Sequence, residues 1–153
     1  MRIYLGDIEC SGFAAFETDF AALYASTSFG KESDLTLDTM VEAAVTAESN
    51  LLGMAFCDIT IVGHSDRVDD EGVSAEDRRA AELDASYQRA TTARDWMFGE
   101  IVTRLSNQGF SPPPDIPGLQ FVTIRIIPCG AADLVNTNPG SDEDLRRANR
   151  RVR

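Results

Sequence analysis

A strand, a polar turn and a long helix follow one another in the middle of the chain, and this order constrains the fold more than any other feature. The strand is an apolar run at 56–62, rich in β-branched residues, and its composition predicts burial on both faces. The turn Gly63-His64-Ser65-Asp66 follows. After an acidic loop, apolar residues keep helical spacing from 75 to 107, and Gly109 ends the pattern. The order predicts a strand and a helix that pack together, as in α/β proteins.

Five further segments complete the predicted fold. The apolar and aromatic run at 22–29 predicts a strand, and apolar residues at helical spacing predict a helix at 37–52. A strand pattern at 119–127 follows a proline-rich connector. A short helix is expected at 141–148, and a last strand is expected to begin at 151. Together these segments describe a βαβα core of the α/β (α+β) class, with a mixed sheet and helices packed on one face.

Asp66 and Arg89 are the candidate binding residues. Asp66 follows the predicted strand, and Arg89 lies on the helix after it. Open α/β sheets hold ligands at the carboxyl ends of their strands. A carboxylate and a guanidinium at that edge can take the ammonium and the carboxylate of a zwitterion. The same two side chains can instead form only an internal salt bridge, and the sequence leaves both interpretations open.

Three motifs, each on its expected element, resemble the OmpA-like peptidoglycan-binding domain. This module also occurs in peptidoglycan-associated lipoproteins and in flagellar stator proteins. The motifs are Gly63-His64-Ser65-Asp66, Ser86-x-x-Arg89-Ala90 and Arg147-Ala148-x-Arg150-Arg151-Val152. The resemblance covers roughly Ala22 to Arg153 and implies an OmpA-like domain at 21–153. Residues 1–20 would form an N-terminal extension that pairs with the sheet edge or contacts a protein partner.

The resemblance implies binding without catalysis. Members of the family hold the diaminopimelate side chain of the peptidoglycan stem peptide without cutting it, and so anchor an assembly to the cell wall. By position, Asp66 would take the side-chain ammonium, Arg89 the carboxylate, and Arg150 would line the same pocket. Glu82 stands where the family has an asparagine. Its negative charge near the carboxylate of the ligand is expected to weaken binding.

Two other functions remain open. A structural component of a larger assembly, for example a phage-like particle, would keep the fold with weak or no wall binding. A wall hydrolase would use His64 and Asp66, but no nucleophile or metal ligand is placed by sequence to join them. His64 is therefore expected to hold the turn through a hydrogen bond, and the chain is expected not to be an enzyme.

Charge and composition argue against several other classes. The net charge of −11 argues against general nucleic-acid binding, which needs a basic face. The three cysteines and the single histidine have no metal-ligand spacing, so neither a metal nor another cofactor is expected. No stretch approaches the roughly 20 apolar residues of a membrane span.

The first residues carry no apolar core of a signal peptide. A peptidoglycan binder must nevertheless reach the wall, and two routes are expected. One is the periplasm or cell envelope, after removal of a targeting segment. The other is a phage-like particle that assembles in the cytoplasm and acts at the wall.

Overall fold

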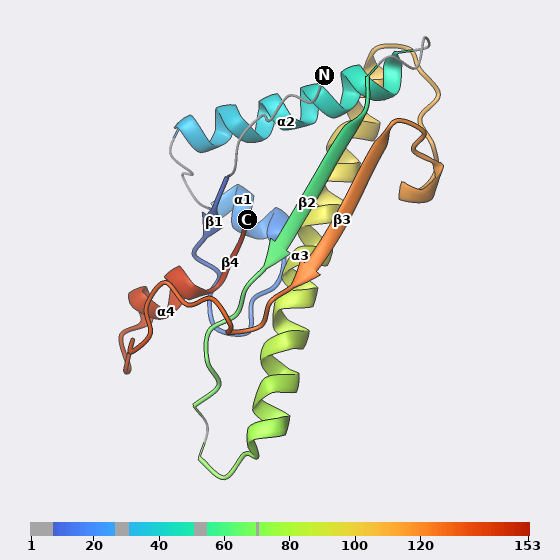
Figure 1. The fold of residues 1–153 in the computed structure, drawn as a ribbon. Coiled ribbons are helices and arrows are strands. Elements are labelled where there is room, and N and C mark those ends of the chain that lie inside the picture. The colour runs from blue at the N-terminus through green and yellow to red at the C-terminus, as the bar shows by residue number, and fades with distance from the viewer. Residues whose placement is uncertain (1–7, 27–30, 51–54, 70) are drawn as a thin grey trace.

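A computed structural model describes residues 8–26, 31–50, 55–69 and 71–153 (Figure 1). For residues 31–36 it describes the backbone alone. The described strands form one mixed sheet. Their order is β1 (Cys10–Ser11), β4 (Arg151–Val152), β2 (Cys57–Gly63) and β3 (Val122–Pro128). β2 and β3 run parallel along their whole lengths, whereas β4 pairs antiparallel with both β1 and β2.

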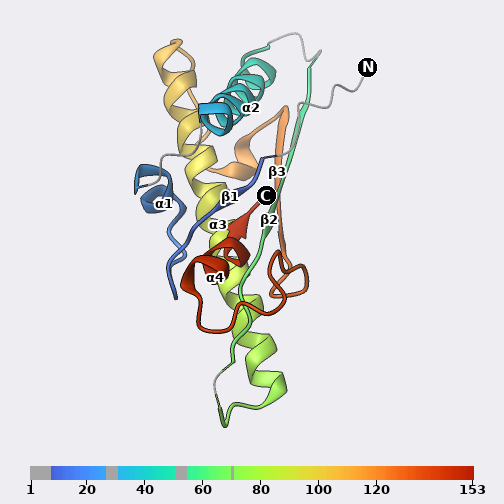
Figure 2. The ribbon, with the colours of Figure 1, turned by 90° about the vertical axis from the view of Figure 1, so that its left-hand side faces the viewer.

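The helices gather on one side of this sheet. They are α1 (Phe20–Ser26), α2 (Lys31–Ser49), α3 (Ala75–Asn107) and α4 (Glu143–Asn149). Figure 2 shows α1, α2 and α3 on the same side of β2 and β3, whose other side carries no α-helix of the described chain. The predicted class, a mixed sheet with helices packed on one face, is confirmed.

One face of β2 and β3 is exposed. Ile61 and Ile124 are buried on the face toward α3, and Asp58, Thr60 and Arg125 are exposed on the other face. Asp58 and Arg125 form an ion pair of 3.1 Å there. The prediction that this strand is buried on both faces is therefore wrong, because helices cover only one side of the sheet.

The helix predicted at 75–107 is confirmed as α3. Ser74 caps it, because the Ser74 hydroxyl accepts a hydrogen bond from the backbone N–H of Asp77 at 3.0 Å. Buried residues recur at helical spacing on the face toward the sheet, among them Ala90, Met97 and Ile101. The helix is about 50 Å long, whereas β2 and β3 are each about 23 Å long. The first turns of α3 therefore project beyond the sheet (Figure 1).

The strand predicted at 22–29 is wrong, because residues 20–26 form helix α1. Asp19 caps this helix by accepting a hydrogen bond from the backbone N–H of Ala22 at 3.2 Å. Phe20 packs against the ring of Trp96, with the ring centroids 5.2 Å apart, and is buried with Leu23. The spacing of these two buried residues is helical. Residues 27–29 lie outside the described part of the chain.

Residues 8–20 belong to the same packed unit as the rest of the chain. β1 forms the edge of the sheet through its pairing with β4. Cys10 and Phe13 are buried in the core. The N-terminal segment was expected to pair with the sheet edge or to contact a protein partner, and residues 10–11 pair with the sheet edge.

The remaining elements lie close to their predicted ranges. α2 begins earlier than residue 37 and ends at Ser49, and the last two residues of its predicted range fall outside the described chain. β3 and α4 each begin two or three residues later than predicted, at Val122 and Glu143. β4 begins at Arg151, as expected.

Candidate functional site

The end of β2 and the middle of α3 pack backbone to backbone. A Cβ atom added to Gly63 would lie 1.9 Å from the carbonyl oxygen of Ser86 and 3.1 Å from the Cβ atom of Ala90. Only glycine allows this approach. The buried Ser86 hydroxyl accepts a hydrogen bond from the backbone N–H of Gly130 at 2.9 Å, which ties the loop after β3 to the same place. The small side chains of Ser86 and Ala90 and the absence of one at Gly63 thus allow α3 to bring Arg89 to the carboxyl end of β2.

Arg89 is buried, with 2% of its surface exposed. Its Nη1 donates to the carbonyl oxygen of His64 at 3.0 Å, and its Nε donates to the carbonyl oxygen of Glu17 at 3.0 Å. The guanidinium carbon lies 5.2 Å from the centroid of the Phe13 ring, a cation–π distance. Arg89 therefore fastens the segment before α1 to the end of β2.

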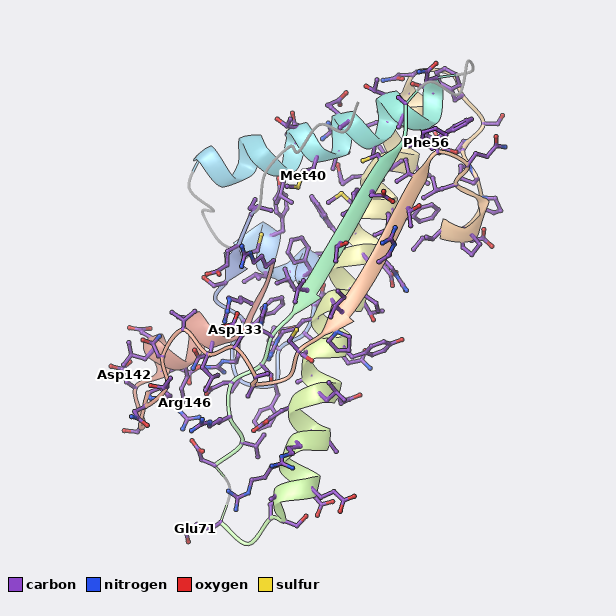
Figure 3. All side chains as sticks on the ribbon, viewed as in Figure 1. Met40, Phe56, Glu71, Asp133, Asp142 and Arg146 are labelled. Carbon is purple, nitrogen blue, oxygen red and sulfur yellow. The ribbon has the colours of Figure 1, made fainter. Side chains whose placement is uncertain are left out.

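Asp66 is held by helix α4 rather than by Arg89. Its Oδ2 accepts a hydrogen bond from Nη1 of Arg146 at 2.8 Å, and its Oδ1 accepts one from Nδ2 of Asn149 at 2.9 Å. Arg146 also binds Asp69 at 2.7 Å. Figure 3 shows Arg146 on the same lobe as Asp142, the residue that caps α4. The side chain of Asp66 is 8% exposed.

Arg150 brings a second guanidinium close to Arg89. Its Nη2 binds Glu143 at 2.6 Å, its Nε donates to the carbonyl oxygen of Arg146 at 3.2 Å, and the residue is buried. Burial, and then the positive charge of Arg150, lower the pKa of Arg89 to about 10, and the charge of Asp66 opposes this shift. The three predicted binding residues therefore lie within electrostatic reach of one another.

Two guanidinium nitrogens in this cluster have no acceptor. In the described part of the chain, no group accepts a hydrogen bond from Nη2 of Arg89 or from Nη1 of Arg150. Neither nitrogen is among the fully enclosed polar atoms that lack a partner. Both nitrogens therefore keep a small contact with the surface, although Arg89 is among the most fully buried side chains of the described residues.

His64 holds the turn through its backbone. Its N–H donates to the carbonyl oxygen of Arg151 at 2.9 Å, and its own carbonyl oxygen accepts the bond from Arg89. The ring is buried, and neither ring nitrogen has a hydrogen-bond partner among the described residues. The hydrogen bonds that hold the turn at His64 are therefore made by its backbone and not by its ring. Burial, and then the charge of Arg151, lower the pKa of His64, so the ring is neutral at pH 7.

Glu82 fixes the loop that follows Asp66. Its Oε1 accepts a hydrogen bond from the backbone N–H of Val68 at 2.9 Å. This bond ties the loop to α3, so Glu82 has a structural partner within the chain, in addition to the effect on a ligand that the resemblance implies.

The predicted residues assemble, but their partners differ from those expected. Asp66 and Arg89 make no ion pair with each other within the described structure. The residues that the sequence did not indicate are Arg146 and Asn149 beside Asp66, and Phe13 and Glu17 beside Arg89. Arg146 precedes the C-terminal arginine motif and Asn149 lies inside it. Arg146 is three positions before Asn149 and four before Arg150, and this helical spacing was the available signal for them. Nothing in the sequence links the other two to Arg89.

A shallow cavity lies elsewhere, against the projecting half of α3. It is lined by Ala80, Leu83, Asp84, Tyr87 and Pro128. None of the predicted site residues lines it. Among the described residues, no cluster of three His, Cys, Asp or Glu side chains is arranged to hold a metal.

Comparison with protein-family models and with curated protein sequences finds no match to this chain. The resemblance to the OmpA-like domain therefore depends on the three motifs alone. No helix in the described part of the chain combines the length and the apolar character needed to cross a bilayer.

Proposed function

We propose that this chain binds the stem peptide of peptidoglycan through diaminopimelate and does not cut it. The observation that carries the proposal is the pair of buried guanidinium groups of Arg89 and Arg150, each with a nitrogen that has no acceptor among the described residues. Two like charges held close together in a poorly solvated position favour an anion between them. A carboxylate matches the fork of a guanidinium, and wall peptides carry free carboxylates.

Asp66 supplies the complementary charge for the ammonium. Each of its oxygens accepts one hydrogen bond from the chain. An ionised carboxylate offers about four lone-pair positions, so each oxygen can take one further donor. A cationic pair and an anion within electrostatic reach suit the two charged ends of a diaminopimelate side chain.

The enclosure of His64 supports binding rather than acid–base chemistry. The charged groups that act on its ring are Arg151, Asp133, Glu9 and Arg153, and not Asp66. We infer a supporting role, in which the backbone of His64 positions Arg89. In this proposal the protein anchors an assembly to the wall, either in the cell envelope or as part of a phage-like particle that acts there.

Retention by insoluble peptidoglycan, with a diaminopimelate peptide as competitor, tests the proposal. The test variant is Arg150→Gln, and Arg147→Gln is the matched control. Both arginines lie at the end of α4 and both pair with Glu143, but Arg147 is half exposed. The parent and the control are expected to bind and to be displaced by the peptide, whereas Arg150→Gln should bind at least about tenfold more weakly. Failure of the folded parent protein to bind would reject the proposal.

A structural component of a larger assembly is the second candidate. The observation that favours it is the low exposure of the two central groups, 8% for the Asp66 side chain and 2% for Arg89. In such a protein the same polar cluster would only hold the segment before α1, β2 and α4 together. A stable complex with a protein partner, without affinity for the wall, would favour this candidate.

A further inference from the structure

Phe16 is an exposed aromatic residue on a strained backbone. It is 97% exposed, and its φ of 61° places it in the left-handed region, as the only described residue other than glycine with a positive φ. That conformation costs a bulky residue about 1–2 kcal/mol. An exposed ring gains no burial energy in return. Neither packing nor local preference therefore explains a phenylalanine at this position.

The turn that presents Phe16 is fastened on both sides. The backbone N–H of Glu17 donates to the carbonyl oxygen of Ala14 at 3.1 Å, which closes the turn. Phe13 before it and Phe20 after it are buried. The two buried rings of Phe13 and Phe20 therefore fix the ends of the turn, and the exposed ring of Phe16 lies between them in the sequence.

The turn is joined to the proposed binding site by a hydrogen bond. The carbonyl oxygen of Glu17, the residue after Phe16, accepts the hydrogen bond from Nε of Arg89. The hydroxyl of Thr92, one turn further along α3, accepts a hydrogen bond from the backbone N–H of Phe20 at 3.2 Å. The Phe16 backbone is therefore one residue away from a group that touches the guanidinium proposed to hold a carboxylate.

We infer that Phe16 is a second contact for the same ligand and packs against the face of a sugar ring in the wall glycan. This inference rests on the proposed function. Each stem peptide is attached to a sugar of the glycan strand, and a few residues of extended peptide span about 3.5 Å each. A peptide held at Arg89 and Arg150 thus carries its sugar within reach of the turn. The C–H face of a pyranose suits an exposed aromatic ring.

The surroundings of Phe16 favour a sugar over a protein partner. Its exposed neighbours along the chain are Ala14, Ala15, Glu17 and Asp19, so the segment that carries the ring offers only small and acidic residues beside it. A stable protein interface needs a contiguous buried patch of about 800 Å² on each side, with several apolar residues at its centre. One ring flanked by carboxylates, which can accept hydrogen bonds from sugar hydroxyls, is instead the arrangement that a carbohydrate requires.

Titration calorimetry with two probes tests this inference. One probe is a diaminopimelate-containing stem peptide, and the other is the same peptide attached to its disaccharide. The parent protein is expected to bind the disaccharide peptide about fivefold to tenfold more tightly than the bare peptide. Phe16→Gly should bring this ratio to about one and leave the affinity for the bare peptide unchanged, because glycine keeps the positive φ and removes only the ring. Phe16→Trp should preserve the ratio.

Phe56→Ala is the matched control, because Phe56 is a second exposed aromatic residue at the start of β2, at the other end of the sheet from Arg146 (Figure 3). It should leave the ratio unchanged. Equal affinity of the parent for both probes, or an unchanged ratio in Phe16→Gly, would overturn the inference while the proposed function stands. A protein complex that is lost in Phe16→Gly, without any sugar preference in the parent, would also overturn it. If the parent binds neither probe, the proposed function fails and this inference fails with it.

Discussion

The backbone of Gly63 touches the backbone of Ser86, so that a Cβ atom on Gly63 would lie 1.9 Å from the Ser86 carbonyl oxygen. The two residues are 23 positions apart in the sequence and begin two of the three motifs. Their contact sets the distance between β2 and α3. It thereby places the guanidinium of Arg89 within 3.0 Å of the carbonyl oxygen of His64.

Gly63→Ala is expected to lower the free energy of unfolding by about 3 kcal/mol or more, since backbone atoms on both sides would have to move apart. Urea denaturation measures the change. Gly99→Ala is the matched control, because Gly99 lies on α3 with open space around its Cβ position. That variant should be more stable than the parent by up to about 1 kcal/mol, from helix propensity. A Gly63→Ala variant as stable as the parent would show that the two backbones are not in contact.

Arg89→Met is expected to lower the free energy of unfolding by about 2–4 kcal/mol. The substitution removes the donors for two carbonyl oxygens, those of His64 and Glu17, and the cation next to Phe13. Arg94→Met on the same helix should change stability by no more than about 0.5 kcal/mol, because among the described residues Arg94 pairs only with the exposed Asp95. Thermal and urea unfolding of both variants provide the comparison. Similar losses in both would contradict the structural role of Arg89.

Thr92→Val should loosen the segment between Phe13 and Phe20. The Thr92 hydroxyl accepts a hydrogen bond from the backbone N–H of Phe20 and donates to the carbonyl oxygen of Thr18. Loss of both bonds is expected to cost about 1–3 kcal/mol and to speed amide exchange of Phe20. Thr103→Val, which removes an exposed hydroxyl bonded within α3, should leave that exchange rate unchanged. If the Phe20 amide exchanges at the same rate in the parent, in Thr92→Val and in Thr103→Val, Thr92 does not hold this segment in place.

The stability of the fold should fall as the pH drops through the titration of His64, the only histidine in the chain. Burial and the charge of Arg151 lower the pKa of His64 below its ordinary value of 6.5, so the unfolded chain binds a proton first. The stabilisation from the neutral ring is therefore complete above pH 6.5 and is lost as the pH falls towards the folded pKa.

Urea denaturation at pH 7.5 and pH 5.5 measures this dependence. His64→Gln should lose less stability than the parent between these two values, because only the parent has an imidazole that must stay neutral. The NMR titration of the single imidazole gives its folded pKa directly. A folded pKa at or above 6.5 would contradict the prediction.

The sequence predicts those parts of the fold that are determined by residues close together in the chain. The range of α3 follows from its apolar period and from Ser74, which caps it. The segment at 22–29 was misassigned because a short aromatic run is compatible with a strand or a helix. Its helical form depends on the cap at Asp19 and on the packing of Phe20 against Trp96, which lies 76 positions later in the sequence.

The sequence predicted that three residues come together, but it did not predict the partners of each. Motif positions bring Asp66, Arg89 and Arg150 close together. The partner of Asp66 depends on how α4 docks, and the partner of Arg89 depends on where residues 13–17 lie. Both are contacts between distant segments, and no local pattern encodes them.

The uneven sheet has a mechanical consequence. β2 and β3 share a seven-residue ladder, whereas β1 and β4 contain two residues each and flank the polar cluster. Local opening at that edge breaks few backbone hydrogen bonds and leaves the ladder and α3 intact. The centre of the molecule therefore resists opening, whereas the edge formed by β1 and β4 opens most easily. A ligand of the proposed kind would reach the polar cluster at that edge without unfolding the sheet.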